Sequence, residues 1–179
     1  MRHFNTNIVE IYLTNKLSEF IKIDKLDSDQ KAEEKWSAHI FILNRKKNII
    51  FTHKETLYSF FVLDITKKEL SVLNRRIYNE LEIQLESDNV DVKKALKYFN
   101  VKDSENIFYL KTDNDQKTLG WTKDLIQVNQ SVCEDFHQDK IISSAFFAHN
   151  MMNSRLVGKR NYTSPIDMLT EKILCKNKP

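Results

Sequence analysis

Glycine, proline and cysteine are scarce in this chain, with two of each among 179 residues. Phosphate-cradling loops need several glycines at fixed spacing, so nucleotide binding through a G-x-G-x-x-G or Walker A loop is excluded. Cys133 and Cys175 form no C-x-x-C pair, and we expect free thiols of a reducing compartment. No apolar run approaches the roughly 20 residues that cross a bilayer, and the N-terminal segment lacks the apolar block of a signal peptide. These absences predict a cytoplasmic protein without a membrane anchor.

The composition is that of one globular domain. Hydrophobic residues make up 41% of the chain, charged residues 30%, and the formal net charge is +3. A chain of this length can bury a sizeable core, so we expect a single domain over residues 1–179. Residues 24–35 are almost wholly polar and predict an exposed, mobile loop within that domain.

The most patterned stretch is WSAHIFILNRKKNIIFTH, residues 36–53, in which two apolar runs flank a polar loop at 44–48. Apolar runs around a short polar loop predict a β-hairpin. If the strands pair about Lys46, His39 lies directly opposite His53. Zinc needs three or four ligands with local spacing, so two histidines predict an ordinary cross-strand pair and no metal site.

Capping and periodicity predict the remaining elements. Strands are expected at 8–13, 56–65 and 106–112, and helices at 14–21, 66–85, 91–99, 118–130, 139–153 and from Pro165 onwards. Thr66 with Glu69 has the spacing of a capping box, and Ser164 precedes Pro165 as a helix cap. The predicted fold is α+β, a small, mostly antiparallel sheet with a central hairpin, flanked by about five helices.

Two basic clusters are candidate contacts with phosphates or with a partner. The hairpin loop carries three successive cations, and a second group lies on the predicted helix at 91–99. Side chains at a hairpin tip stay in solvent while the sheet fixes their position, so the tip can reach phosphates or can simply keep the hairpin soluble. The candidate contacts are Arg45, Lys46, Lys47, Lys93, Lys94 and Lys97.

The predicted helix at 139–153 is apolar almost all round. Such a helix lies either at the centre of a core or under a partner, and exposed apolar patches mark interaction surfaces. We expect an interface, and most closed homo-oligomers are twofold dimers. The residues predicted to form this homodimer or partner interface are Ile142, Phe146, Phe147, Met151 and Met152.

Several short motifs together resemble a widespread family of small, uncharacterised bacterial proteins that carry a domain of unknown function and often lie near mobile elements. The matching residues are Trp36, Ala38, His39, Arg45, Lys46, Thr112, Asn114, Leu119, Gly120, Ser164 and Pro165. His39 departs from the commoner Asn, and Trp121 and Lys123 also differ from the family pattern. The resemblance implies no catalytic residue. It suggests a role near mobile DNA or in defence, by analogy with CRISPR-associated accessory proteins.

The sequence contains no set of residues with the spacing of a known catalytic motif, so no catalytic, cofactor-binding or metal-binding residue is assigned. Our leading hypothesis is a non-enzymatic accessory protein that self-associates and binds a larger protein or nucleoprotein, such as an RNA-guided CRISPR nuclease. The alternative is a nucleic-acid-binding regulator that uses the basic hairpin tip and the face formed by Lys93, Lys94 and Lys97. A third hypothesis is an enzyme with an unrecognised site around His39, His53 or the Cys133/His137 pair.

Overall fold

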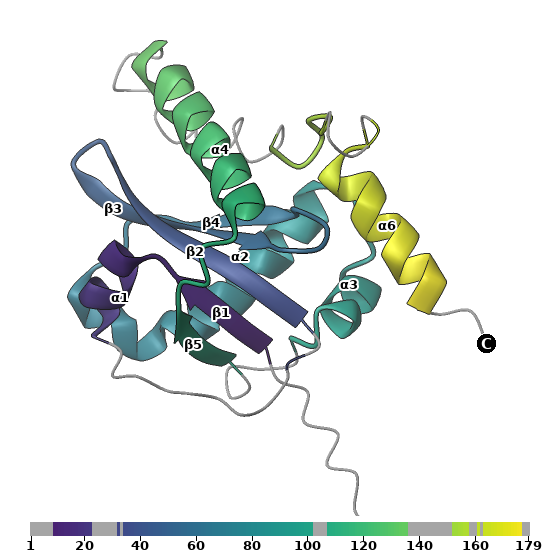
Figure 1. Cartoon of the computed structure of the whole chain (residues 1–179), viewed down its shortest axis with the longest axis horizontal. Helices are drawn as coiled ribbons and strands as arrows, with labels where there is room; N and C mark the ends of the chain where they lie inside the picture. Colours follow the sequence, from purple (N-terminus) through teal and green to yellow (C-terminus); the bar gives the residue numbers. More distant parts are fainter. Residues whose placement is uncertain are drawn as a thin grey trace, which may run out of the picture.

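The computed structural model describes residues 9–22, 32, 34–101, 107–135, 152–157, 161 and 163–176. Its elements, shown in Figure 1, are five strands, one 3₁₀ helix and five α-helices. They are β1 (Val9–Leu13), α1 (Asn15–Ile21), β2 (Glu34–Leu43), β3 (Lys46–His53), β4 (Ser59–Val62), the 3₁₀ helix η1 (Lys67–Val72), α2 (Leu73–Ser87), α3 (Val92–Tyr98), β5 (Ile107–Lys111), α4 (Gln116–Asp135) and α6 (Pro165–Lys176).

The strands form one mixed sheet in the order β4-β3-β2-β1-β5. The β4/β3 and β3/β2 pairings are antiparallel, whereas the β2/β1 and β1/β5 pairings are parallel. The α+β class and the central hairpin are therefore confirmed, with antiparallel pairing confined to half of the sheet. The parallel pairings arise because helical or long connections, rather than tight turns, join β1 to β2 and to β5.

The register of the β2–β3 hairpin differs from the prediction. The turn contains only two residues, Asn44 and Arg45, whose φ angles of 50° and 63° are both left-handed. This is the pattern of a type I′ turn, whose twist matches that of paired strands. Trp36 consequently pairs with His53, and His39 pairs with Ile50. The prediction that His39 lies opposite His53 is wrong, because a shift of three residues moves His39 to the other face of the sheet.

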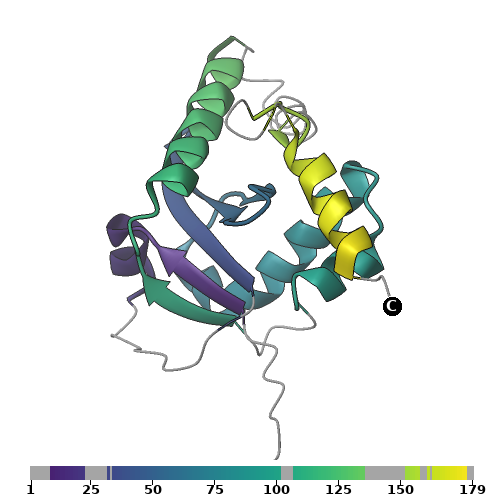
Figure 2. The same ribbon diagram turned by 45° about the vertical axis from the view of Figure 1, so that its right-hand side comes forward.

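Strand alternation gives the sheet two different faces. Alternate residues of β2, among them Trp36, Ala38 and Ile40, belong to the main core with the buried α2 stripe Leu73, Ile77, Leu81 and Leu85. The other face holds a smaller core in which Phe41, Ile50 and Phe61 pack against Leu125 and Ile126 of α4. In Figures 1 and 2 the sheet accordingly lies between α4 and α2.

The predicted helix starts are present. Glu69 Oε2 accepts hydrogen bonds from the Thr66 backbone N–H at 2.9 Å and the Thr66 hydroxyl at 2.8 Å. Pro165 opens α6, and the Asp167 N–H donates to Ser164 Oγ at 3.2 Å. Within the predicted mobile loop at 24–35, residues 34 and 35 belong to β2 and Ala32 is buried, while the other positions lie outside the described residues. Of the predicted helix at 139–153, only Met152 and Asn153 are described.

Candidate functional site

The basic hairpin tip is held firmly by its neighbours. Arg45, Lys46 and Lys47 are all exposed. Lys46 Nζ forms an ion pair with Asp64 of the segment after β4. Lys47 Nζ lies 4.4 Å from the centre of the Phe20 ring, a cation–π contact that brings α1 beside the tip. The sheet, an ion pair and a stacked ring thus fix where these cations are presented.

The second basic cluster lies elsewhere. Lys93, Lys94 and Lys97 are exposed on α3, at the end of the sheet opposite the hairpin tip (Figure 1). Lys94 Nζ is 2.8 Å from Asp91, the residue that caps this helix. The structure therefore does not bring the two predicted contact sets together.

On the side of the sheet that α4 partly covers, a cluster of charged residues lies on β1 and the start of β2. Here β1 and β2 present Glu10, Tyr12 and Lys35 on one side, because Glu10 pairs with Lys35 in register. Tyr12 Oη donates to Glu10 Oε2 at 2.8 Å, and Lys35 Nζ is 3.9 Å from the same oxygen. Lys54 Nζ lies 3.8 Å from the centre of the Tyr12 ring and pairs with Asp113. We call this side of β1, β5 and the first half of β2 the open face.

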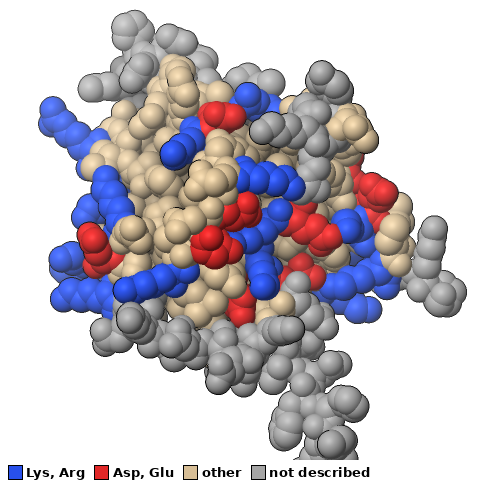
Figure 3. All heavy atoms as spheres, in the orientation of Figure 1, with Lys and Arg blue, Asp and Glu red and all other residues tan. Residues whose placement is uncertain are grey.

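Charges on the open face are arranged in neighbouring opposites, and Figure 3 shows acidic and basic side chains alternating at the centre of this view. Glu10 is only 3% exposed, so its charge is stabilised mainly by these close partners. Burial, followed by the hydrogen bond to Glu10, raises the pKa of Tyr12 to about 12. The Tyr12 hydroxyl therefore keeps its proton at neutral pH and acts as a hydrogen-bond donor rather than as a base.

His39 lies on the same face, farther along β2 toward the tip. Burial lowers the pKa of His39, and the positive charges of Lys123 on α4 and Lys16 on α1 lower it further. Because this pKa lies below 6.5, His39 is neutral at pH 7. Its Nδ1 atom is buried and has no hydrogen-bond partner among the described residues. The side chain is thus an uncharged hydrogen-bonding group in a positively charged environment.

A row of hydroxyl groups crosses this face from strand to strand. Ser59, Thr52, Ser37 and Tyr12 occupy successive strands at one register position. Thr52 Oγ1 lies 3.1 Å from both Ser59 Oγ and Thr122 Oγ1 of α4. The first half of α4 therefore packs on the sheet partly through buried hydroxyls. Sequence reasoning missed this row, because only the register between distant strands aligns its members.

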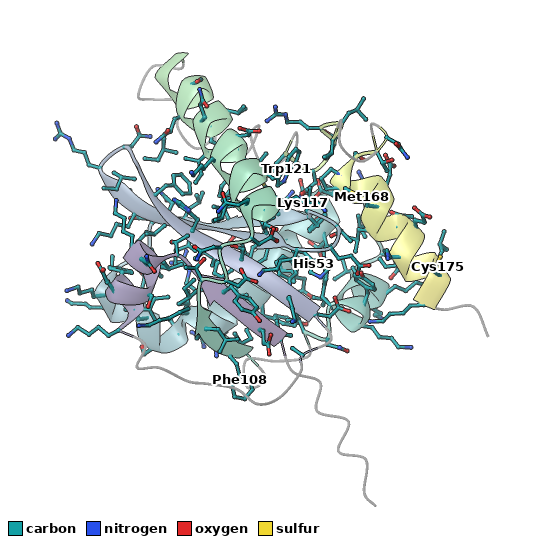
Figure 4. All side chains as sticks on the ribbon, viewed as in Figure 1. His53, Phe108, Lys117, Trp121, Met168 and Cys175 are labelled. Carbon is teal, nitrogen blue, oxygen red and sulfur yellow. The ribbon has the colours of Figure 1, made fainter. Side chains whose placement is uncertain are left out.

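The opposite face holds a buried network around His53 (Figure 4). His53 Nε2 is 2.9 Å from Glu34 Oε2, and His53 Nδ1 is 2.9 Å from Thr56 Oγ1. The Thr56 backbone N–H also donates to Nδ1 at 3.3 Å, which makes Nδ1 the acceptor and places the ring proton on Nε2, facing Glu34. The imidazole is 1% exposed and lies 5.0 Å, centre to centre, from both Trp36 and Phe99.

A hydroxyl, an imidazole and a carboxylate in a line also occur in hydrolytic triads. Here Thr56 Oγ1 accepts the Tyr58 backbone N–H at 3.2 Å, and Thr56 is 1% exposed. The hydroxyl is therefore committed to the turn between β3 and β4, where no substrate carbonyl can approach it. We interpret this network as the support of that turn.

Helix α6 is attached to the same end of the sheet by two lysines. Lys176 Nζ donates to Glu34 Oε1 at 2.8 Å, and Lys172 forms an ion pair with Glu55. Tyr98 Oη of α3 also donates to Glu55, at 2.8 Å. Burial alone would raise the pKa of Glu55, but the hydrogen bonds from Lys172 and Tyr98 outweigh burial and lower it.

The predicted interface is corrected at one position. Met152 is 2% exposed and packs in the core beside Phe41, Ile50 and Phe61, so its surface is already buried within the chain. Ile142, Phe146, Phe147 and Met151 lie outside the described residues, as do the side chains of the Cys133/His137 pair. Cys175 is an exposed free thiol on α6.

Two further searches cover the described part of the chain. No three His, Cys, Asp or Glu side chains there are grouped so that they could hold a metal ion. None of the described helices combines the length and apolar character needed to cross a membrane.

Comparison with known proteins gives one match. Neither a curated protein nor a solved structure matches the chain. A family model described as Domain of unknown function (DUF6933) matches residues 10–168. This range includes the hairpin tip, the open face, the His53 network and the start of α6. Because the match spans most of its length, the chain belongs to the DUF6933 family.

Proposed function

We propose that this protein is a non-enzymatic binding module that attaches to a nucleoprotein through its hairpin tip. The observation that carries the proposal is the set of three exposed cations, Arg45, Lys46 and Lys47, at a turn of only two residues. The second central position of a type I′ turn favours glycine, and a residue with a Cβ costs about 1 kcal/mol there. A short turn of defined geometry holds the cations at a fixed place on the sheet, where they can meet phosphates.

The charges around the tip support a polyanionic partner. Lys47 stacks on Phe20 of α1, so the tip and the exposed Lys16 lie at the same end of the sheet. Lys16 and Lys123 also act together on His39. Positive charge thus extends from the tip over α1 to the middle of β2. A chain of phosphates complements such a surface, since each phosphate can meet one cation.

The partner that we propose is a larger ribonucleoprotein or nucleoprotein, and by analogy with small accessory proteins it is an RNA-guided CRISPR nuclease of bacterial defence. The alternative, direct binding to free nucleic acid as a regulator, uses the same tip. A purified duplex therefore serves as a probe for both.

The tip can be tested with variants of equal charge at the two ends of the sheet. We expect Arg45→Ala/Lys47→Ala to weaken binding to a labelled DNA duplex about tenfold in low salt. Each lost phosphate contact lowers the slope of log K against log salt by about 0.9, so the slope should fall by about 1.8. Fluorescence anisotropy at several salt concentrations measures both quantities.

The matched control is Lys93→Ala/Lys97→Ala on α3, which removes the same charge far from the tip. This control should leave the affinity nearly unchanged. Equal losses for the two double variants would mean that net charge alone drives binding, and the proposal would then be wrong. Arg45→Gly adds a second check, because it should relax the turn, raise the melting temperature and still weaken binding.

We also propose that the protein is a homodimer. The support is the sequence pattern at 139–153, in which large apolar side chains surround a predicted helix. Static light scattering at micromolar concentration is expected to give twice the chain mass of 21.3 kDa. A mass equal to one chain would contradict the dimer without affecting the tip proposal.

A further inference from the structure

The open face carries aromatic rings on neighbouring strands. In the β1/β5 register, Phe108 lies beside Glu10 and Leu110 lies beside Tyr12, so Phe108 and Tyr12 are diagonal neighbours on one side of the sheet. Such neighbours are about 7–8 Å apart, within reach of one ligand. Phe108 is 36% exposed, and Tyr12 is held in place by Glu10 and Lys54. In Figure 4 Phe108 projects from β5 at the border of the molecule.

Cations line both ends of this face. Lys35 and Lys54 lie at one end with the aromatic rings, where they pair with Glu10 and Asp113, while the charges of Lys16 and Lys123 act on His39 farther along β2. A strand rises about 3.3 Å per residue, so β2 carries the face roughly 20 Å from Ser37 to Leu43 at the turn. Toward the tip this side of β2 is covered by α4, because Phe41, 6% exposed, packs against Leu125 and Ile126. The accessible cations beside the rings are therefore Lys35, Lys16 and Lys123, which are all exposed.

The chemistry of the face fits unpaired bases. Single-stranded nucleic acid is bound by positive grooves that follow the backbone and by aromatic side chains on which bases stack. Sheet faces that display aromatic residues on adjacent strands serve this purpose. A duplex cannot use these groups, because its bases are already stacked and paired.

We propose that the open face binds single-stranded nucleic acid, with a base stacked on Phe108 beside Tyr12 and the phosphates near Lys35, Lys16 and Lys123. This inference rests on the proposed function, since it adds a base-binding surface to the phosphate-binding tip. It also specifies the form of nucleic acid that the nucleoprotein partner must expose.

The test compares a labelled single-stranded oligonucleotide of about 15 nucleotides with its blunt duplex, using anisotropy on the full-length protein. The wild type should bind the single strand about tenfold more tightly. Phe108→Ala should reduce that affinity about tenfold, since stacking of one base contributes this much, while the salt slope stays unchanged. Phe108→Trp, which keeps a stacking ring, should retain it. The control is Leu174→Ala, which truncates an exposed apolar residue of α6.

The outcomes separate this inference from the proposed function. Equal binding of single strand and duplex, or equal effects of Phe108→Ala and Leu174→Ala, would contradict base binding by the open face. Neither result would affect the proposal that the hairpin tip binds phosphates. Failure of both probes to bind in low salt would overturn both proposals. Unchanged melting curves for the Phe108 variants establish that a loss of affinity reflects stacking rather than unfolding, and a lowered melting temperature for both Phe108 variants would assign Phe108 to the fold.

Discussion

Replacing His53 with alanine is expected to lower the free energy of unfolding by about 3–5 kcal/mol. Two losses add in this substitution. The imidazole packs against Trp36 and Phe99 at 5.0 Å, so its removal leaves a cavity in the main core. The carboxylate of Glu34, 4% exposed, also loses the ring N–H that donates to it at 2.9 Å. Urea titration followed by circular dichroism measures the change.

The matched control is His39→Ala, the same substitution on the other face of the same hairpin. His39 is half-buried, and its Nδ1 has no hydrogen-bond partner among the described residues, so the expected change is below about 1 kcal/mol. His53→Gln, which can still donate to Glu34, should recover part of the loss. If His53→Ala and His39→Ala have similar small effects, the His53 network does not stabilise the fold as described.

This contrast between two histidines also shows how far the sequence could be read. Apolar runs, caps and a helical stripe were sufficient to place β2, β3, α2 and α6, because each of those signals is local. The polar residues at 44–48 predict one loop, although β3 already begins at Lys46. Asn44 and Arg45 form a type I′ turn without the glycine that usually marks one. The register error followed from this missing signal.

The buried networks could not be predicted for a different reason. Glu34 and His53 meet only after the register is fixed, and Lys176 reaches Glu34 from α6 across 142 positions of sequence. The open face likewise depends on β5 pairing with β1 in parallel, which joins segments almost 100 residues apart. Composition and periodicity carry no information about such pairings. The exposed tip cations, in contrast, were visible because they are consecutive in the sequence.

The second large effect is expected at Asn153, which closes the outer edge of the sheet. Asn153 Oδ1 accepts the Ser59 backbone N–H at 2.8 Å, and its Nδ2 donates to the Ser59 carbonyl at 2.8 Å. The side-chain amide thus pairs with β4 as a neighbouring strand would. Nδ2 also donates to Asp88 Oδ2 at 2.9 Å, an oxygen that further accepts from Tyr58 and Gln84. Asn153 and Ser59 are both fully buried, so no water replaces a lost bond.

We therefore expect Asn153→Ala to lower the free energy of unfolding by about 2–4 kcal/mol, because both backbone groups of Ser59 lose their partner. Asn129→Ala is the control: among the described residues this amide, 5% exposed, donates to the Leu125 carbonyl of its own helix, at 2.9 Å, and its loss should cost about 1 kcal/mol or less.

Asn153→Asp adds a test of pH dependence. Burial already raises the pKa of Asp88, and a second carboxylate beside it raises both values above those of the unfolded chain. The folded state then takes up protons at higher pH than the unfolded state, so the deficit of Asn153→Asp relative to the wild type should shrink from pH 7 to pH 5. A deficit that is constant over this range, or equal losses for Asn153→Ala and Asn129→Ala, would show that this amide does not hold the edge of the sheet.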